Sequence, residues 1–460
     1  MMAPTSSLSG HYDLPYLPDN STMRDIEEAL GQQHYLSYAP PNIYPMSAPA
    51  FQEDAAIRPP HTGGPLGLYV HIPFCKYACS FCFYAKSIGD NRDTMVRYVE
   101  ALERELEWVP SGTPLTQVFV GGGTPTALPP DLLDRSLTAV FRNVGTSVLT
   151  HTVECSPDTL TDEHIAVIRG HGVGRVSMGI QSTHDETLEL IRRKHAGNVA
   201  LDTCRKLVAS GLMVNIDLIY GLPGQTMEHF RRDFDLVAAS GVHSVTAYNL
   251  RVNEKTPVVR KLGAEERLDT LSGLMHWRSF VKSVALQAGY RQTRCHTFVR
   301  SDREDAGSKI AADFKDMTGR GDQFSAGMSA RSRLGDRIYR NDRVMKSYVE
   351  SIENGSSPVK ETFQLDEMGR KIRHLALTFG EGEELNLAEY EALFGNPFEQ
   401  DFGIPLIQTS QAGLVEGTAT IRLTHTGRLL YDRVMMAFYP ENVKSWLRER
   451  ESIGLAPKTI

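Results

Sequence analysis

The run His71-Ile72-Pro73-Phe74-Cys75-Lys76-Tyr77-Ala78-Cys79-Ser80-Phe81-Cys82 is the most informative stretch of this chain. It places Cys75, Cys79 and Cys82 at the spacing C-x3-C-x2-C within one short loop. Three thiolates this close together would bind three irons of a [4Fe–4S] cluster, which needs a fourth ligand. Zinc sites more often use paired C-x2-C units and a second Cys or His pair, and no such pair follows here. The spacing therefore favours an iron–sulfur cluster over a zinc site or three unrelated buried thiols.

A cluster held by three cysteines leaves one iron without a protein ligand. Open coordination positions perform chemistry, whereas fully ligated sites hold structure. In the best-known case, S-adenosylmethionine (SAM) fills the open position through its amino and carboxylate groups. An electron from the reduced cluster then splits the sulfonium and yields a carbon radical. The cysteine loop thus predicts a site that generates radicals.

Further motifs follow the cysteine loop, and their order strengthens this interpretation. They are Gly121-Gly122-Gly123-Thr124-Pro125-Thr126, Val153-Glu154-Cys155, Ser177-Met178-Gly179-Ile180-Gln181-Ser182, Asn215-Ile216-Asp217-Leu218-Ile219-Tyr220-Gly221-Leu222-Pro223 and Gly327-Met328-Ser329-Ala330-Arg331-Ser332. With Leu68–Cys75 they resemble the radical SAM superfamily and, within it, the oxygen-independent coproporphyrinogen III oxidase family. The resemblance runs from about Leu68 to about Tyr439. One glycine-rich turn would be weak support, but these motifs in this order are specific.

Length, charge and cysteine usage limit the class of protein. The chain has 460 residues, enough for one large domain and a smaller one. Its net charge of −7 argues against a broad nucleic-acid surface. It lacks a long apolar run, and its start lacks a basic flank and an apolar core, so we expect no membrane span and no secretory signal. Its six cysteines do not form a disulfide framework, so we expect free thiols in the cytoplasm. We also expect the protein to be a monomer.

Short β-rich runs alternate with helical stretches between about residues 67 and 299, which predicts a parallel sheet with crossover helices. A doubly wound open sheet would show the same pattern. The resemblance implies instead a partial (β/α)6 TIM-like barrel, in an α/β fold. The expected strands are Leu68–Ile72, Gln117–Val120, Thr150–Glu154, Arg175–Gln181, Asn215–Tyr220 and Val245–Asn249. The expected helices are Thr94–Trp108, Asp131–Arg142, Asp162–Gly170, Leu188–Gly211 and Thr226–Ser240.

The barrel domain is expected over residues 65–344, between two flanking segments. Residues 1–64 read as an N-terminal extension with one helical piece near Met23–Gly31. In the resembled family this segment covers the active site, and the alternative is a mobile arm. Residues 345–460 predict helices and a hairpin at Gly413–Leu423, as in a winged-helix-like cap domain. Such modules often bind DNA, but the acidic residues near Glu381–Glu384 favour a lid over the barrel.

The resemblance implies a set of SAM contacts at the carboxyl ends of the barrel strands, where side chains converge. Glycine in the turn after the second strand lets the backbone approach a ligand closely. Carboxylates and an arginine suit a zwitterionic, cationic ligand. Core packing for the aromatic residues and surface ion pairs for the charged ones are the alternatives. The implied SAM-binding residues are Tyr69, Phe81, Gly122, Gly123, Thr124, Glu154, Gln181, Arg193, Asp217 and Ile219.

Two departures from the oxidase pattern bear on the reaction. Tyr84 stands where the oxidases carry a further cysteine, and Cys295-His296-Thr297 replaces an Asp-His pair. We therefore take Tyr84, Cys295 and His296 as candidate catalytic residues. His296 would exchange a proton near neutral pH, or would simply pack in the fold. The arginines that follow Ala330, namely Arg331, Arg333, Arg337, Arg340 and Arg343, would receive substrate carboxylates or form a solvated charged segment.

These departures resemble those of class C methyltransferases, cyclopropane-forming enzymes and anaerobic haem-opening methyltransferases. The first hypothesis is therefore methyl or methylene transfer to a carbon centre, with a second SAM as carbon donor. The alternatives are oxidative decarboxylation of coproporphyrinogen III and haem binding and delivery. The expected substrate is a tetrapyrrole or a natural-product intermediate. The expected electron donor is a flavodoxin or ferredoxin, and no nucleic-acid or membrane partner is expected.

Overall fold

The computed structural model describes residues 20–30, 52–53, 66–142, 151–250, 257–258, 271–294, 296–302, 322–380 and 382–445. Within these ranges, strands and helices alternate through the first two thirds of the chain, and helices dominate the last third. The fold is α/β with a mostly parallel central sheet, as the sequence predicts.

One large sheet organises the described part of the chain. It contains 13 strands in the order β1-β15-β14-β13-β12-β2-β5-β6-β7-β8-β9-β11-β10. The strands from β12 to β9 run parallel, and those outside them pair antiparallel. The central strands are β2 Leu66–Ile72, β5 Leu115–Gly122, β6 Thr152–Cys155, β7 Arg175–Gln181, β8 Met213–Tyr220 and β9 Ser244–Asn249. The flanking strands are β1 Gln52–Glu53, β10 Tyr290–Gln292, β11 Thr297–Arg300, β12 Asp322–Ala326, β13 Arg331–Leu334, β14 Arg337–Asn341 and β15 Val359–Gln364.

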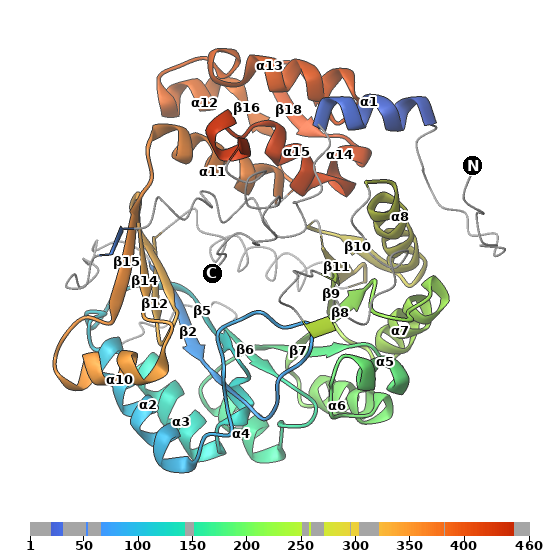
Figure 1. Cartoon of the computed structure of the whole chain (residues 1–460). Helices are drawn as coiled ribbons and strands as arrows, with labels where there is room; N and C mark the ends of the chain where they lie inside the picture. The colour runs from blue at the N-terminus through green and yellow to red at the C-terminus, as the bar shows by residue number, and fades with distance from the viewer. Residues whose placement is uncertain are drawn as a thin grey trace.

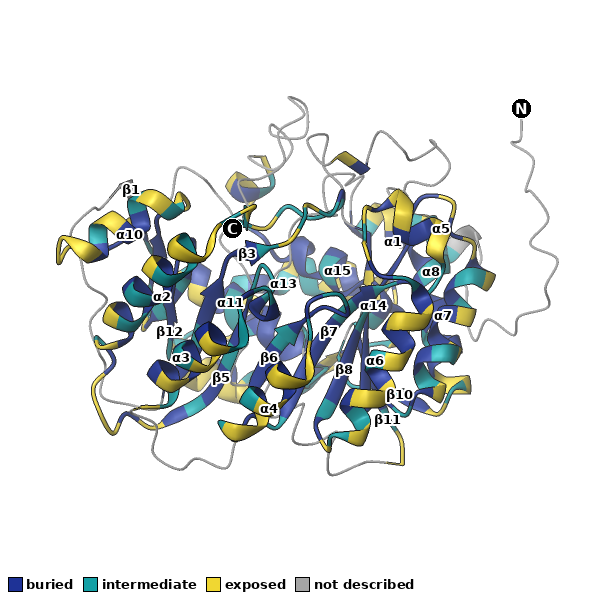
Figure 2. Ribbon diagram, turned by 90° about the horizontal axis from the view of Figure 1, so that it is seen from below, coloured by how far each residue is buried: buried dark blue, intermediate teal, exposed yellow. Residues whose placement is uncertain are grey.

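Crossover helices cover the outer face of the curved sheet. Figure 1 shows them as an arc outside the strands, and Figure 2 shows their buried sides against the sheet and their exposed sides facing outward. Most of the buried apolar side chains lie in this layer, which forms one continuous core. The helices are α2 Arg92–Leu106, α3 Pro130–Phe141, α4 Asp162–Gly170, α5 Asp185–Leu190, α6 Gly197–Ala209, α7 Met227–Ala239, α8 Leu271–Gln287 and α10 Met345–Glu353.

Local sequence sets where several of these helices begin. Asn91 caps α2 by accepting from the Thr94 N–H, and Thr161 caps α4 in the same way through His164. The single helix predicted over Leu188–Gly211 is wrong, because the chain forms α5 and α6 with a break between them. Gly197 starts α6, donates to Asp185 at 2.7 Å, and packs so closely on the Thr183 carbonyl that no side chain would fit.

Strands β12 to β15 extend the barrel sheet beyond β2, and a buried carboxylate ties them to α2. Glu105 accepts from the Gly327 N–H at 2.7 Å, from Asn341 at 2.6 Å and from the Tyr348 hydroxyl at 2.7 Å. Burial raises the pKa of Glu105 to about 7, although these three donors oppose the shift. Glu105 thus fixes the loop after β12 against the barrel.

The C-terminal helices form a second layer with its own apolar core. This layer lies across the top of the sheet in Figure 1. Its elements are α11 Glu367–Gly380, α12 Leu387–Phe394, α13 Phe398–Gln411, α14 His425–Leu429, α15 Tyr431–Ala437 and a small antiparallel sheet of β16 Leu385–Asn386, β17 Val415–Gly417 and β18 Thr420–Leu423. The expected hairpin is therefore present. The chain reaches this layer directly from β15, so we propose that the cap begins near residue 366, since α10 and β15 pack with the barrel sheet.

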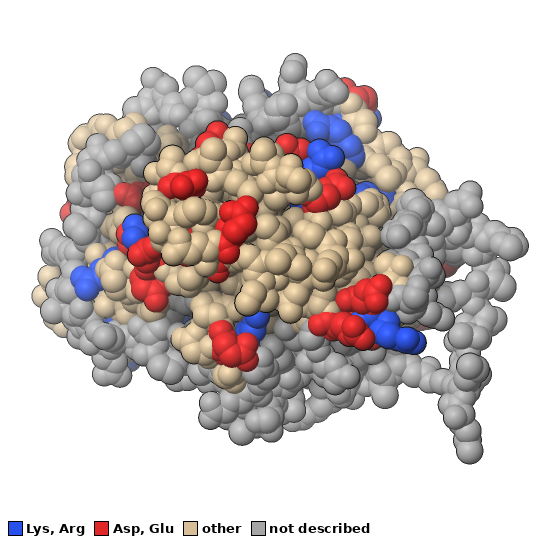
Figure 3. Space-filling model, turned by 90° about the horizontal axis from the view of Figure 1, so that it is seen from above, with Lys and Arg blue, Asp and Glu red and all other residues tan. Residues whose placement is uncertain are grey.

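Contacts with α1 and α8 hold the second layer to the rest of the described chain. Helix α1, Asn20–Leu30, packs on α13 and α15 and buries Ile26 and Leu30 in their core. Arg278 of α8 forms a buried bidentate pair with Asp432 of α15, at 2.6 and 2.8 Å. No helix in the described ranges is long and apolar enough to cross a membrane. Figure 3 shows more acidic than basic side chains on the described upper face.

Candidate active site

A pocket lies where the carboxyl ends of the central strands meet the cysteine loop. Most of the predicted site residues line it, although they come from six separate strands and loops. From the predicted set it contains Cys75, Cys79, Phe81, Cys82, Tyr84, Gly122, Gly123, Thr124, Glu154, Gln181, Arg193 and Asp217. It also contains residues that the sequence did not single out, namely Lys76, Tyr77, Lys86, Ser156, Asp158, Thr159 and Ser177.

The cysteine loop leaves β2 and is anchored on both sides of the pocket. The Ser80 N–H donates to the Ile191 carbonyl at 3.0 Å, which ties the loop to the end of α5. The Cys82 N–H donates to the Cys79 carbonyl at 3.3 Å, which forms a turn between these two cysteines. The short strands β3 Phe74–Cys75 and β4 Ser87–Ile88 pair and close the loop at its base.

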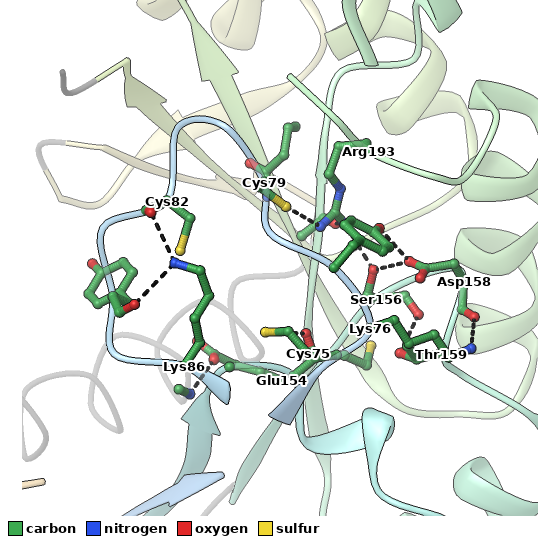
Figure 4. A pocket seen from close by; sticks show the side chains of 18 of the residues that line it. Cys75, Lys76, Cys79, Cys82, Lys86, Glu154, Ser156, Asp158, Thr159 and Arg193 are labelled. Carbon is green, nitrogen blue, oxygen red and sulfur yellow. Dashed lines mark hydrogen bonds between the residues drawn. The ribbon is translucent and has the colours of Figure 1, made fainter. Parts of the chain in front are cut away.

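All three cysteine side chains lie in this pocket, where cationic and hydroxyl groups approach the sulfurs (Figure 4). Arg193 donates to Cys79 Sγ at 3.6 Å, and Thr124 Oγ1 lies 3.8 Å from Cys75 Sγ. Burial raises the pKa of the Cys75 thiol to about 11 and also raises that of Cys79, against the lowering effect of Arg193. A coordinated thiol is deprotonated outright, so a bound metal would reverse these shifts.

The donor set fits a cluster better than a single ion. Among the described residues, no three His, Cys, Asp or Glu side chains already stand as a mononuclear metal site. Four irons spread their ligands farther apart than one ion does, and thiolates are their usual ligands. Cys155 borders the pocket, but it packs in the apolar core beside Cys204. The three loop cysteines are therefore the ones placed to hold a [4Fe–4S] cluster.

The glycine turn after β5 brings bare backbone to the pocket. Gly122 has a φ of +115°, and a Cβ there would lie 2.6 Å from the ring of His71. A Cβ on Gly123 would lie 2.6 Å from the backbone of Pro73. Only glycine therefore allows the cysteine loop and this turn to pack together, with the Gly122 N–H donating to Glu154 and the Gly123 N–H donating to the Ile72 carbonyl.

Two carboxylates line the inner wall of the barrel. Glu154 accepts from the Gly122 N–H at 3.0 Å, and Asp217 accepts from Asn215 at 2.9 Å and from Ser177 at 3.3 Å. Burial raises the pKa of Glu154 to about 7, and the charge of Asp217 adds to the shift. Burial also raises the pKa of Asp217 to about 6, against the lowering effect of Arg175. This pair is poised to receive a cation.

Arg193 and Gln181 occupy constrained positions at the pocket wall. Arg193 donates to Ser156 at 2.9 Å and to the Gly179 carbonyl, besides its bond to Cys79. Gln181 has a φ of +72° at a bulge between β7 and β8. Such backbone is rare for a residue with a side chain and is typical of functional sites. Asp158 organises this wall by accepting from Tyr77 at 3.0 Å and from Ser156 at 2.5 Å.

Two predicted SAM contacts lie just behind the pocket surface. Tyr69 stacks on Phe119 with ring centroids 6.1 Å apart, and its hydroxyl lies 3.2 Å from Nδ1 of His71. Ile219 belongs to a small apolar cluster with Leu188, Ile191, Leu222, Leu250 and Val258, and Phe81 packs against this cluster. Phe81 and Ile219 therefore form one apolar wall beside the cysteines.

The three candidate catalytic residues are not brought together at the pocket. Tyr84 lines it, stacks on Phe83 at 4.8 Å, and is 51% exposed. His296 lies elsewhere, beside Tyr248 at a centroid distance of 5.9 Å and near enough to Asp432 to lower its pKa. Cys295 lies outside the described residues. The geometry thus keeps Tyr84 in the site, whereas His296 is not among the described residues that line the pocket.

Sequence reasoning missed Lys86 and Asp158, for which the motif pattern gave little signal. Lys86 donates to the carbonyls of Cys82 at 3.0 Å and Tyr84 at 3.2 Å, and so clamps the loop after its last cysteine. A lysine four residues past the last cysteine was the available signal. Asp158 follows the Val153–Cys155 motif, and nothing in the sequence shows that Tyr77 reaches it.

Comparisons with known proteins agree with this geometry. Residues 69–237 match the family model described as the radical SAM superfamily. The chain is 26% identical over 382 residues to the haem chaperone HemW of Bacillus subtilis, covering 81% of this chain and 99% of HemW. It is 28% identical over 432 residues to the oxygen-independent coproporphyrinogen III oxidase of Pseudomonas aeruginosa, covering 89% and 93%. The structure of Escherichia coli coproporphyrinogen III oxidase HemN, a radical SAM enzyme, matches with a TM-score of 0.71 at 25% identity, over 82% of this chain and 90% of HemN.

Proposed function

We propose that this chain, a radical SAM protein similar to the oxygen-independent coproporphyrinogen III oxidases, performs radical chemistry on the propionate side chains of a tetrapyrrole. Its cofactors are a [4Fe–4S] cluster and SAM, as its radical SAM domain implies. The observation that carries the proposal is one pocket that joins the three cysteines to Arg193, the glycine turn and the Glu154–Asp217 pair.

The loop cysteines would hold the cluster and leave one iron for SAM. When bound, the cluster supplies the electron that splits the sulfonium and generates a carbon radical. Arg193 places a positive charge beside Cys79 and orients that thiolate through its bond at 3.6 Å. Lys86 fixes the loop carbonyls and adds a second cation near the cysteines. Both residues would stabilise the negative charge that three thiolates bring to the pocket.

The remaining pocket residues would bind and orient SAM. Backbone carbonyls of Gly122 and Gly123 would accept from its amino group, since neither residue carries a side chain and their N–H groups already donate to Glu154 and the Ile72 carbonyl. The carboxylates of Glu154 and Asp217 would face its cationic and ribose parts. Phe81 and Ile219 would supply an apolar surface for adenine. Tyr69, Thr124 and Gln181 would complete this pocket.

Oxidative decarboxylation is the reaction that the comparisons support in place of methyl transfer. Curated relatives that align over most of the chain are named as coproporphyrinogen III oxidases. The methyl transfer that the sequence first suggested gains no support from the comparisons, and a second SAM stays a proposal. Tyr84 remains a departure from the oxidase motif, so the identity of the product decides between these reactions.

Haem binding and delivery is the second candidate. The haem chaperone of Bacillus subtilis aligns over nearly its whole length, which gives this function as much sequence support as the oxidase. The exposed Tyr84 beside the cluster loop is the structural feature that favours it, because phenolate oxygen is a known axial ligand of haem iron. A chaperone would bind haem stably and would turn over no substrate.

Anaerobic turnover separates these functions. The reconstituted protein is reduced and incubated with coproporphyrinogen III and SAM labelled in its methyl group. Decarboxylation would give 5′-deoxyadenosine, carbon dioxide and an unlabelled product. Methyl transfer would give S-adenosylhomocysteine and a labelled product. A delivery protein would give none of these and would retain added haem. The physiological electron donor, a flavodoxin or ferredoxin in our proposal, is replaced here by a chemical reductant.

A further inference from the structure

A buried carboxylate from the outer helical layer reaches the turn that follows β7. Asp233 lies on α7, which stands outside the sheet in Figure 1, and its side chain is fully buried. It accepts from the Ser182 hydroxyl at 2.8 Å, and from the Thr183 N–H and the Thr183 hydroxyl, both at 2.6 Å. Three donors from two consecutive residues therefore converge on one carboxylate.

This carboxylate grips the turn more strongly than a neutral side chain would. An ionised group loses its hydration when it is buried, and burial accordingly raises the pKa of Asp233. The hydrogen bonds from Thr183 and Ser182 oppose this shift, because they stabilise the charged form. Hydrogen bonds to an ionised acceptor are about twice as strong as those between neutral groups. The turn after β7 is thus held by charge-assisted bonds.

The residue directly before this turn is Gln181, which lines the pocket where SAM would bind (the SAM pocket). Its φ of +72° lies in the left-handed region, which is uncommon for any residue with a side chain. Strand β7 shifts its register against β8 between Gly179 and Gln181, so that Gln181 stands opposite Leu218. Bulges of this kind re-aim side chains beside active sites. The backbone conformation of Gln181 therefore sets the direction of its amide group.

Helix α6 holds the same turn from a second side. A Cβ on Gly197 would lie 1.9 Å from the Thr183 carbonyl oxygen, and the Gly197 N–H donates to Asp185 at 2.7 Å. Thr183 is thus held between α6 and α7. A strained backbone conformation persists only where its surroundings over-determine it. The contacts of Thr183 with Asp233 and Gly197 meet this condition two residues after Gln181.

A displacement of Gln181 would reach the wall of the SAM pocket. A Cβ on Gly179 would lie 2.7 Å from Gln181 Nε2, so the Gln181 amide lies against bare backbone. The Gly179 carbonyl in turn accepts from Arg193, which also lines the pocket. The turn and the pocket wall therefore share one packed segment.

We propose that Asp233 is a positioning residue, which holds Gln181 in its left-handed conformation and so directs the Gln181 amide toward bound SAM. Asp233 is not among the described residues that line the pocket, so it acts through Gln181. This role rests on the proposed contact between Gln181 and SAM. It does not depend on which reaction follows the cleavage of SAM.

A double-mutant cycle on SAM affinity tests this role without turnover. The full chain, with its cluster reconstituted and no reductant, is titrated with SAM in a calorimeter. Gln181→Ala should weaken SAM binding on the order of tenfold, through loss of its hydrogen bonds. Asp233→Asn should weaken it by a similar factor, because an amide offers one acceptor oxygen to three donors. The double variant should bind SAM no more weakly than Gln181→Ala, since Asp233 then has no side chain to direct.

Iron content shows that each variant holds its cluster. Asp235→Asn is the matched control and should bind SAM like the wild type, because Asp235 is an exposed carboxylate two residues further along α7. If Asp233→Asn fails to fold, Thr183→Val takes its place in the cycle, since it removes one donor to Asp233 and keeps the shape of the side chain. It should weaken SAM binding by roughly threefold, and only while Gln181 is present.

Losses that multiply in the double variant, to about a hundredfold, would overturn the proposal, because Asp233 would then act on the pocket by a route that excludes Gln181. Wild-type SAM affinity in Asp233→Asn, or in Thr183→Val where that variant replaces it, would overturn it as well. Wild-type affinity in Gln181→Ala would also overturn it, by showing that Gln181 does not contact SAM. None of these results would bear on the proposed reaction, since the titration contains no substrate.

Discussion

Arg193 donates to Cys79 Sγ at 3.6 Å, although 114 positions separate these residues in the sequence. This contact joins the cysteine loop after β2 to the loop after α5, and so links the cluster site to the wall of the SAM pocket. An arginine is needed at this position because its branched guanidinium group can donate to Cys79, Ser156 and the Gly179 carbonyl together.

Replacing Cys79 with alanine should remove nearly all iron from the anaerobically reconstituted protein, because the variant leaves two of the three loop thiolates that would hold the cluster. Iron and sulfide analysis measures this. Cys204→Ala is the control, since Cys204 packs in the barrel core away from the pocket. Equal iron content in the two variants would show that Cys79 is not a ligand.

Arg193→Lys should keep the cluster but weaken SAM binding by about tenfold, because lysine keeps the positive charge and loses the branched guanidinium group with its several N–H donors. Isothermal titration with SAM and no reductant measures the affinity. Arg192→Lys is the matched control, since Arg192 is exposed and is not among the residues that line the pocket. Wild-type SAM affinity in Arg193→Lys would mean that the guanidinium group of Arg193 has no part in binding SAM.

Gly122→Ala should lower stability by more than the roughly 1–3 kcal/mol typical of a strained φ, because its Cβ would also collide with His71. SAM cleavage should fall sharply for the same reason. Gly172→Ala also places a side chain at a positive φ, of +71°, closer to the allowed left-handed region than the +115° of Gly122 and with open space around its Cβ. Thermal unfolding of both variants separates strain from collision, and equal losses would argue against close packing at the glycine turn.

SAM binding should strengthen as the pH rises through about 6 to 7, the raised pKa values of Asp217 and Glu154. Each carboxyl is neutral below its pKa and attracts a cation only above it. The same pKa shifts have the opposite effect on the folding stability of the protein without SAM. Its folded state holds these protons more tightly than the unfolded chain, so the pair's contribution to stability falls as the pH rises from about 4 to about 7.

Titrations with SAM at several pH values measure this dependence. Glu154→Gln should weaken binding at the alkaline end and flatten the profile, because one titrating carboxyl is removed. A pH profile of SAM affinity in Glu154→Gln that matches the wild type would exclude Glu154 as the source of the pH dependence. Thermal unfolding without SAM, measured over the same pH values, checks that the stability contribution of the pair falls as the pH rises.

Arg278→Ala should destabilise the chain by roughly 3–5 kcal/mol, because it leaves the buried Asp432 carboxylate unpaired. Arg278→Met with Asp432→Leu should recover part of this loss, since the isolated charge is then absent. Chemical unfolding compares the two variants. An Arg278→Ala variant as stable as the wild type would show that the Arg278–Asp432 pair does not hold the C-terminal layer in place.

The sequence predicted the parts of this site that follow from local pattern. Strand β7 and helix α4 were predicted at their observed bounds, because period and capping residues define them. The cysteine loop, the glycine turn and Glu154 were expected near one another, because parallel strands bring their carboxyl ends together.

What the sequence did not predict depends on contacts between distant segments. Arg278 of α8 meets Asp432 of α15 only because the C-terminal layer packs against the barrel helices. The break before Gly197 depends on its packing against Thr183. The position of His296 beside Tyr248 and near Asp432 likewise depends on tertiary packing, and its catalytic role stays a prediction. Motif order carries no information about these tertiary contacts.

The most direct test of the central claim is turnover of coproporphyrinogen III by the reduced, cluster-loaded protein with methyl-labelled SAM. We predict 5′-deoxyadenosine and carbon dioxide together, an unlabelled product, and loss of all three results in Cys79→Ala. Absence of 5′-deoxyadenosine with an intact cluster, or label from the SAM methyl group in the product, would contradict the account.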